Sequence, residues 1–156
     1  MSDLTKSIET LTREEALEAA QNLALRISKD ESPGDREEAV LKPLIEKPFE
    51  NIQEIEQLAR LVLLTAAANP ENDEVVRSAI AGAGRKQFIL GGAEIVVLAT
   101  VGLFALNLLV TKGKASEHET IKIEEADGKT TITVENQVSY GISQSLGQVL
   151  KSYFGR

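Results

Sequence analysis

The chain has 156 residues, no cysteine and a formal net charge of -7 at pH 7. This length fits one domain, or one small domain with appendages. The lack of cysteine excludes a disulfide framework and cysteine-ligated zinc or iron–sulfur sites. The charge is uneven, because residues 1–82 hold 17 acidic and 9 basic side chains, whereas residues 83–156 hold 7 and 8. The acidic half argues against a nucleic-acid partner, since phosphate binding needs clustered Lys and Arg.

Residues 1–82 predict an acidic bundle of four or five helices. Thr12 and Glu15 fit a capping box, and the helix behind them should run from Arg13 to about Ser28. The opening residues are polar and lack the apolar run of a secretory signal, so we expect this part of the chain in the cytoplasm.

Three further helices complete the predicted bundle. Asp35 is the expected N-cap of a short helix that Pro43 can end early. Asn51 is the expected N-cap of a stronger helix, whose C-terminal half should be the best-buried part of the bundle. A last helix should start at Asn72 or Asp73.

The most informative segment runs from residue 88 to residue 110 and reads FILGGAEIVVLATVGLFALNLLV. Its single charge is Glu94, and a helix of this length spans a bilayer core of about 30 Å. We therefore predict a transmembrane helix within residues 85–112. Basic residues near its two ends are nearly balanced, so the positive-inside rule leaves its orientation open. They are Arg85, Lys86, Lys112 and Lys114.

The same segment also fits a helix that is wholly buried in a soluble fold or assembly. Glu94 weakens the membrane interpretation, because a carboxylate in a bilayer costs several kcal/mol unless it is protonated or paired. Small and polar residues in the segment predict a helix–helix interface. Glu94 and Asn107 lie about 140° apart on a helical wheel, which favours contacts on two sides and an oligomer larger than a dimer. The predicted interface residues are Gly91, Gly92, Glu94, Ala99, Gly102, Ala105 and Asn107.

Residues 117–156 predict a β-hairpin followed by a helix. Asp127 and Gly128 fit a two-residue type I′ loop, and centring the register on that loop pairs Ile123 with Ile132. Ser143 is the expected cap of a short amphipathic helix at the end of the chain.

No enzyme signature is present. The single histidine, His118, lies in a polar stretch without a neighbouring cysteine, and no serine sits in a G-x-S-x-G elbow. We therefore expect no catalytic, cofactor-binding or metal-binding residue.

Together these patterns predict an α+β protein that is mostly α. It would comprise an acidic helical bundle (1–82), one long apolar helix (85–112) and a hairpin–helix unit (117–156). The expected function is that of a non-enzymatic single-pass protein of an inner or plasma membrane. It would oligomerise through its apolar helix, as a membrane-perturbing effector or a membrane-anchored adaptor. Its expected partners are other copies of the chain, lipid and a protein bound to residues 1–82. The alternative is a soluble interaction protein that buries residues 88–110 in a homo-oligomer or filament.

Overall fold

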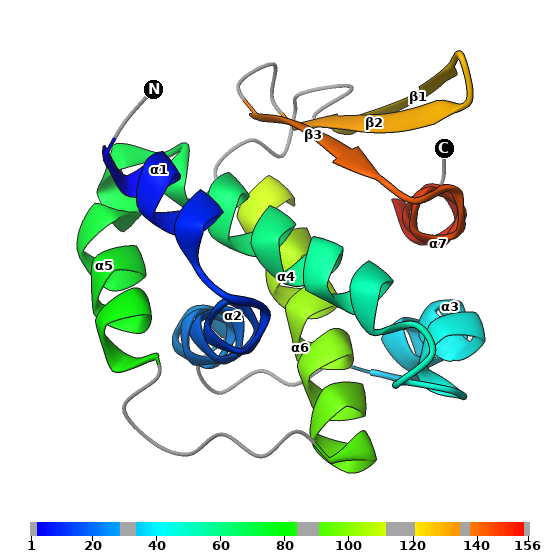
Figure 1. The fold of residues 1–156 in the computed structure, drawn as a ribbon, viewed down its shortest axis with the longest axis horizontal. Helices are drawn as coiled ribbons and strands as arrows, with labels where there is room; N and C mark the ends of the chain where they lie inside the picture. Colours follow the sequence, from blue (N-terminus) through cyan, green and yellow to red (C-terminus); the bar gives the residue numbers. More distant parts are fainter. Residues whose placement is uncertain (1–2, 29–33, 84–90, 112–120, 135–137, 155–156) are drawn as a thin grey trace.

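A computed structural model describes residues 3–28, 34–83, 91–111, 121–134 and 138–154. The predicted residues Arg85, Lys86, Lys112, Lys114 and His118, and the first three residues of the apolar segment, lie outside these ranges. The described chain has the predicted α+β architecture, with a helical bundle, one long apolar helix and a small antiparallel sheet followed by a short helix (Figure 1).

In the described ranges, five α-helices and one 3₁₀ turn precede the apolar helix. Helix α4 is the central one of these, and its C-terminal half is buried as predicted, with Leu61, Val62 and Leu63 fully inaccessible. The bounds are α1 (Asp3–Thr10), α2 (Arg13–Ser28), α3 (Asp35–Ile45), α4 (Ile52–Ala67), η1 (Pro70–Asn72) and α5 (Asp73–Gly82).

The helix starts show where local sequence decided the structure. Thr12 and Glu15 form the predicted capping box, in which the Glu15 amide donates to Thr12 Oγ1 (3.2 Å) and the Thr12 amide donates to Glu15 Oε1 (2.9 Å). Helix α3 is capped one residue earlier than predicted, at Gly34, and continues through Pro43. Asn51 precedes α4, but its side chain makes no cap bond there.

The Asn51 amide instead points back toward the end of α3. It donates to the carbonyl oxygens of Leu44 (3.2 Å) and Lys47 (3.2 Å). These carbonyls lie at and just beyond the end of α3, where backbone acceptors lack helical partners. The predicted cap residue therefore closes the preceding helix rather than opening the next.

Helix α6 (Gly92–Thr111) runs through the middle of the molecule. It packs against α2 and α4, and along α3 (Figure 1). Ile95, Leu103 and Leu106 are fully buried there, and Leu98 is 2% exposed. The apolar helix is thus part of the same hydrophobic core as the acidic bundle. The proposed division of the chain into three independent parts stays a prediction.

The C-terminal part is a three-stranded antiparallel sheet in the order β1-β2-β3, followed by α7 (Gln144–Phe154). Strands β1 (Ile121–Ala126) and β2 (Lys129–Val134) pair in the predicted register, with Ile123 opposite Ile132. Asp127 and Gly128 both have positive φ, at 56° and 76°, as a type I′ loop requires. Ser143 Oγ accepts from the Leu146 amide, which confirms the predicted cap of α7.

The third strand is an addition to the predicted hairpin. Strand β3 (Val138–Ile142) pairs with β2 and places Tyr140 opposite Ile132. A lone hairpin is marginal in water, so a third strand and a covering helix give the unit the support it needs. Helix α7 packs against both β1 and β2 and also reaches α3 and α4.

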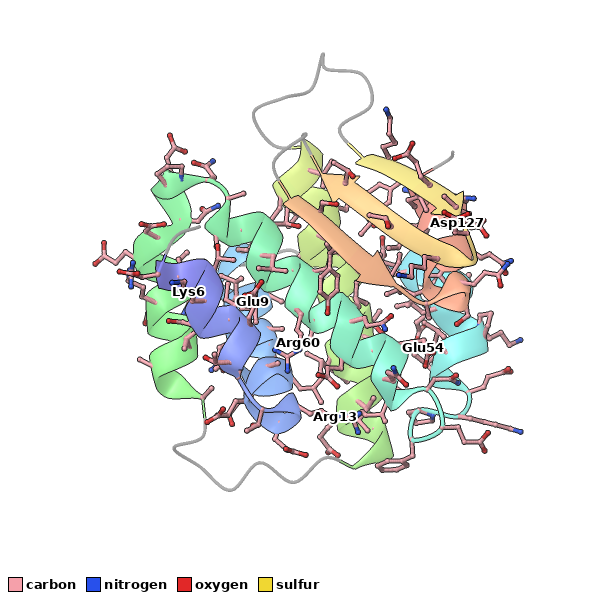
Figure 2. All side chains as sticks on the ribbon, turned by 45° about the horizontal axis from the view of Figure 1, so that its top comes forward. Lys6, Glu9, Arg13, Glu54, Arg60 and Asp127 are labelled. Carbon is pink, nitrogen blue, oxygen red and sulfur yellow. The ribbon has the colours of Figure 1, made fainter. Side chains whose placement is uncertain are left out.

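An ionic network ties α1 and α2 to α4. Arg60 donates to the carbonyl oxygens of Ile8 (2.9 Å) and Leu11 (2.7 Å) and to Glu56 (3.0 Å). Arg13 donates to the other Glu56 oxygen (2.7 Å). Burial alone would raise the pKa of Glu56, but the two arginines outweigh it and hold the pKa below its usual value. Figure 2 shows Arg13 and Arg60 close together, whereas Lys6 and Asp127 lie far apart on the periphery.

Candidate functional site: the apolar helix and the groove beside it

Helix α6 differs from the other helices because its outward side is apolar as well as its buried side. Val97 is 49% exposed, and Phe104 and Leu108 are half-buried. These three residues follow helical spacing and form a stripe along one side of α6. Between Ile95 and Val110 the helix carries no charge. Among the described residues it is the one helix long and apolar enough to cross a bilayer, and 56% of that span is buried within the chain.

The small residues predicted for a helix–helix interface face other helices of the same chain. Ala99 and Ala105 are buried. Gly102 faces α4, because a Cβ atom placed on it would lie 4.0 Å from a methyl group of Val62. Ala99 and Gly102 also line a tight space with Ala20 of α2, too small to admit a water molecule. These side chains therefore let α2 and α4 approach α6 closely. A further contact with another copy of the chain stays a prediction.

Glu94 lies in the first turn of α6 and is exposed. Its side chain folds back over Gly91, where a Cβ atom would collide with the Glu94 carboxylate. The N-terminus of a helix favours a negative charge, so this position has a local explanation. Gly92 contacts the Pro48–Phe49 turn, and Asn107 is half-buried near the other end of the helix. The structure thus separates Glu94 from the buried small residues with which it was grouped.

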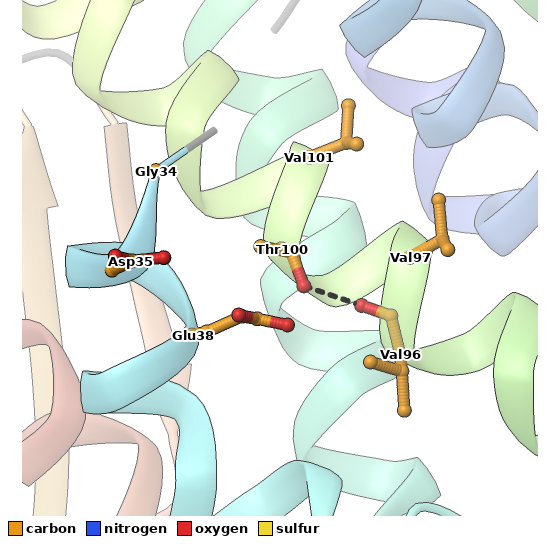
Figure 3. A pocket seen from close by; sticks show the side chains of 7 residues that line it. All are labelled: Gly34, Asp35, Glu38, Val96, Val97, Thr100 and Val101. Atoms are coloured by element: carbon orange, nitrogen blue, oxygen red, sulfur yellow. Dashed lines mark hydrogen bonds between the residues drawn. The ribbon is translucent and has the colours of Figure 1, made fainter. Parts of the chain in front are cut away.

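An open groove lies between α3 and α6 (Figure 3). It consists of two adjoining hollows of about 280 Å³ and 490 Å³, which share Asp35, Glu38 and Val96. The first hollow is lined by Gly34, Asp35, Glu38, Val96, Val97, Thr100 and Val101. The second adds Ala39, Lys42, Ile45 and Glu46 from α3. Nothing in the sequence indicated that these residues would line one groove, because α3 and α6 meet only in the fold.

The groove has an apolar floor and an acidic rim. Valines of α6 form the floor, and the Thr100 hydroxyl is already used, since it donates to the Val96 carbonyl oxygen (2.6 Å). Glu38 extends from α3 toward Thr100 in Figure 3. Neither Asp35 nor Glu38 has a hydrogen bond or ion pair with any described residue. The groove therefore offers apolar contact and negative charge to a ligand.

A buried polar contact fixes the wall of the groove. Glu37 is 6% exposed and accepts from the Tyr153 hydroxyl (2.5 Å) and the Gly34 amide (2.6 Å). Arg36 lies over the Tyr153 ring, 4.4 Å from its centroid, and donates to the Tyr153 carbonyl oxygen. Burial first, and Glu37 next, raise the pKa of Tyr153 well above its usual value. This contact joins α3 to α7, so the position of α3 beside α6 depends on the end of the chain.

No group of three or more His, Asp or Glu residues that could hold a metal ion occurs in the described part of the chain. No family model matches the sequence, and neither a curated protein nor a solved structure matches it. The functional interpretation consequently depends on the chain's own physical chemistry.

Proposed function

We propose that this is a non-enzymatic membrane-associating protein that stores its apolar helix in a water-soluble bundle and transfers it to a bilayer. The observation that carries this proposal is the apolar outward stripe of α6. A core helix with one side open to water usually carries polar side chains on that side. Here the outward positions are Val97, Phe104 and Leu108, and Val97 is half exposed to water.

The energetics of such a transfer are balanced rather than one-sided. The four large buried side chains of α6 each gain about 1.5–3 kcal/mol from leaving water. A bilayer core gives them a comparable gain, since lipid tails are as apolar as the protein interior. The bilayer also covers the outward stripe, which the bundle leaves wet. The opposing cost is exposure of the faces of α2 and α4 that α6 now covers. The four side chains are Ile95, Leu98, Leu103 and Leu106.

Assembly in the membrane belongs to the same proposal. Ala99, Gly102 and Ala105 contact helices of the same chain in the bundle, and an inserted α6 would present them to other copies. Residues 1–82 would stay in the cytoplasm and bind a protein partner. The assembled form would either perturb the membrane or anchor an adaptor there.

A second candidate is a soluble interaction protein in which α6 remains the core helix. The burial of 56% of the apolar span and the fully buried Leu103 and Leu106 favour it. In that case the outward stripe of α6 would be covered by a partner or by another copy of the chain, because exposed apolar surface of this kind marks interaction sites.

Fractionation separates the two candidates. Cells that express the chain are lysed without detergent, and the membrane pellet is washed with carbonate and then with detergent. Membrane insertion predicts that the protein resists carbonate and leaves with detergent. The purified protein should also float with phosphatidylcholine vesicles and cross-link as an oligomer there. Recovery in the soluble fraction, with no flotation, would establish the second candidate and reject the first. Dye release from loaded vesicles then distinguishes a membrane-perturbing protein from an anchor.

A further inference from the structure

The groove between α3 and α6 combines three properties that bear on what it could bind. Its floor is apolar and includes Val97, which is 49% exposed. Its two hollows adjoin at Val96, so the apolar floor continues from α6 onto Ala39 and Ile45 of α3. Its rim carries three carboxylates and one ammonium group. From these properties we infer that the groove is the docking site for a basic amphipathic helix of another protein.

The shape and the floor select an amphipathic partner. A helix laid into a groove binds through side chains at i, i+3, i+4 and i+7, which enter a row of apolar hollows. The valines of α6 and Ile45 of α3 supply such a row. The floor adds no polar specificity, since the Thr100 hydroxyl is already bonded to its own helix. A polar or extended ligand would leave this floor wet.

The rim selects a basic partner. Asp35 and Glu38 have no hydrogen bond or ion pair with any residue in the described ranges, and Glu46 lies further along the same rim. Acidic side chains at the start of a helix are also stabilised by the helix dipole. In α3, however, Glu37 is the acid that bonds the N-terminal backbone, since it accepts from the Gly34 amide. Glu38 turns toward the groove instead (Figure 3). Lysine or arginine flanking an apolar stripe would meet the carboxylates of Asp35 and Glu38, whereas an anionic lipid surface would be repelled by them.

This inference does not depend on membrane insertion, because the groove exists only while α6 is in the bundle. A partner seated in it would contact α3 and α6 together and hold α6 in place. The two proposals therefore have separate tests. Failure of flotation leaves the groove proposal intact, and failure of peptide binding leaves the membrane proposal intact.

The test uses the full chain and a fluorescein-labelled peptide of about four helical turns, with leucines on one face and lysines on the rest. Fluorescence anisotropy measures binding. The matched probe replaces every lysine with glutamate. We expect the basic peptide to bind, the acidic one to fail, and the affinity to fall as salt rises from about 50 to 300 mM.

Two variants of the groove and two matched controls locate the site. The double variant Asp35→Asn/Glu38→Gln should bind the basic peptide with about 2- to 30-fold lower affinity. The control double variant Glu9→Gln/Glu14→Gln, at two exposed acids elsewhere, should leave that affinity unchanged. Val97→Gln should weaken it about 3- to 10-fold, whereas Leu25→Gln, at a side chain 54% exposed on α2, should not.

Several results would overturn the inference. If the control variant Glu9→Gln/Glu14→Gln lowered the peptide affinity equally, the peptide would be binding through the net charge of the protein and not through the groove. Equal binding of the acidic peptide would remove the role of the rim. If Val97→Gln abolished binding to phosphatidylcholine vesicles and left the peptide affinity unchanged, the occupant would be lipid. If it abolished self-association in sedimentation velocity and left the peptide affinity unchanged, the occupant would be a second copy.

Discussion

Two arginine substitutions in α6 separate a helix held in the bundle from a helix inserted in a bilayer. Leu103 is fully buried and Val97 is 49% exposed. Leu103→Arg places a guanidinium in the core, at a cost of several kcal/mol against a typical domain stability of about 5–15 kcal/mol. Val97→Arg places it on the surface, where most substitutions change stability by about 0.5 kcal/mol or less. The water-soluble form should therefore tolerate Val97→Arg and lose its fold with Leu103→Arg.

Membrane insertion gives a different pattern for the same two variants. Val97 lies two residues from the middle of the apolar segment 88–110. Arginine near the centre of a spanning helix costs about 2.5–3.5 kcal/mol on insertion scales. That cost corresponds to a roughly 70- to 400-fold fall in the inserted fraction. Val97→Arg should thus keep the bundle folded and remove it from membranes.

The assay pairs urea unfolding, followed by far-UV circular dichroism, with flotation on vesicles. Leu25→Arg is the control, because Leu25 is exposed on α2 and lies outside the apolar segment. It should change neither measurement. If Val97→Arg floats as well as the unaltered chain, α6 does not enter the bilayer and the reasoning fails. If Leu103→Arg unfolds at the same urea concentration as the unaltered chain, α6 is not the core helix.

Four further predictions concern stability. Tyr153→Phe should cost about 1.5–3 kcal/mol in urea unfolding because it leaves the buried Glu37 Oε2 without its donor, whereas Tyr140→Phe, whose hydroxyl bonds no described residue, should cost much less. Burial raises the pKa of both tyrosines, so phenolate absorbance of the folded protein should stay below half-maximal at pH 10. Stability should fall as the pH rises past 10, because the unfolded chain then loses phenolic protons that the folded chain keeps. Half-ionised tyrosines in the folded protein at pH 10 would contradict the structure. Gly128→Val should cost about 1–3 kcal/mol and reduce amide protection in residues 121–134, because valine resists the φ of 76° there; unchanged protection would reject the turn. The pKa of Glu56 is lowered, so its contribution to the free energy of unfolding should be complete above about pH 4.5 and lost on further acidification. Glu56→Gln should make stability depend less on pH in that range. An unchanged pH profile would show that the ion pairs of Glu56 with Arg13 and Arg60 do not stabilise the fold.

Local chemistry decided which parts of the fold could be read from the sequence. The capping box at Thr12 and the loop at Gly128 each need only residues within a few positions, and both formed as predicted. The third strand was missed although Val138, Tyr140 and Ile142 alternate with Ser139 and Gly141, because the run is short and glycine is disfavoured in strands. Asn51 has the residue type of an N-cap, yet its Nδ2 donates to carbonyls at the end of α3 and its side chain makes no cap bond to α4.

The site was harder to predict because it depends on distant contacts. The groove needs α3 beside α6, and the bond between Glu37 and Tyr153 joins residues 116 positions apart. Neither the groove nor this bond has a sequence signal, because nothing in the local sequence distinguishes an acid or aromatic residue that will be buried from one that will stay exposed. The apolar character of α6 was evident, but hydropathy cannot separate the side that meets α2 and α4 from the side that meets water.

The place of α6 in the chain has a consequence for synthesis. The ribosome makes α1 to α5 before α6, so the surfaces of α2 and α4 that will receive it stand open until it emerges. At about 5–20 residues per second, residues 84–111 take roughly 1–6 s to make. During that interval the early helices lack the helix that completes their core. If α6 inserts as proposed, the unfinished bundle and a nearby bilayer would compete for it as it emerges, and a change in translation speed alone would then alter the fraction of chains that insert.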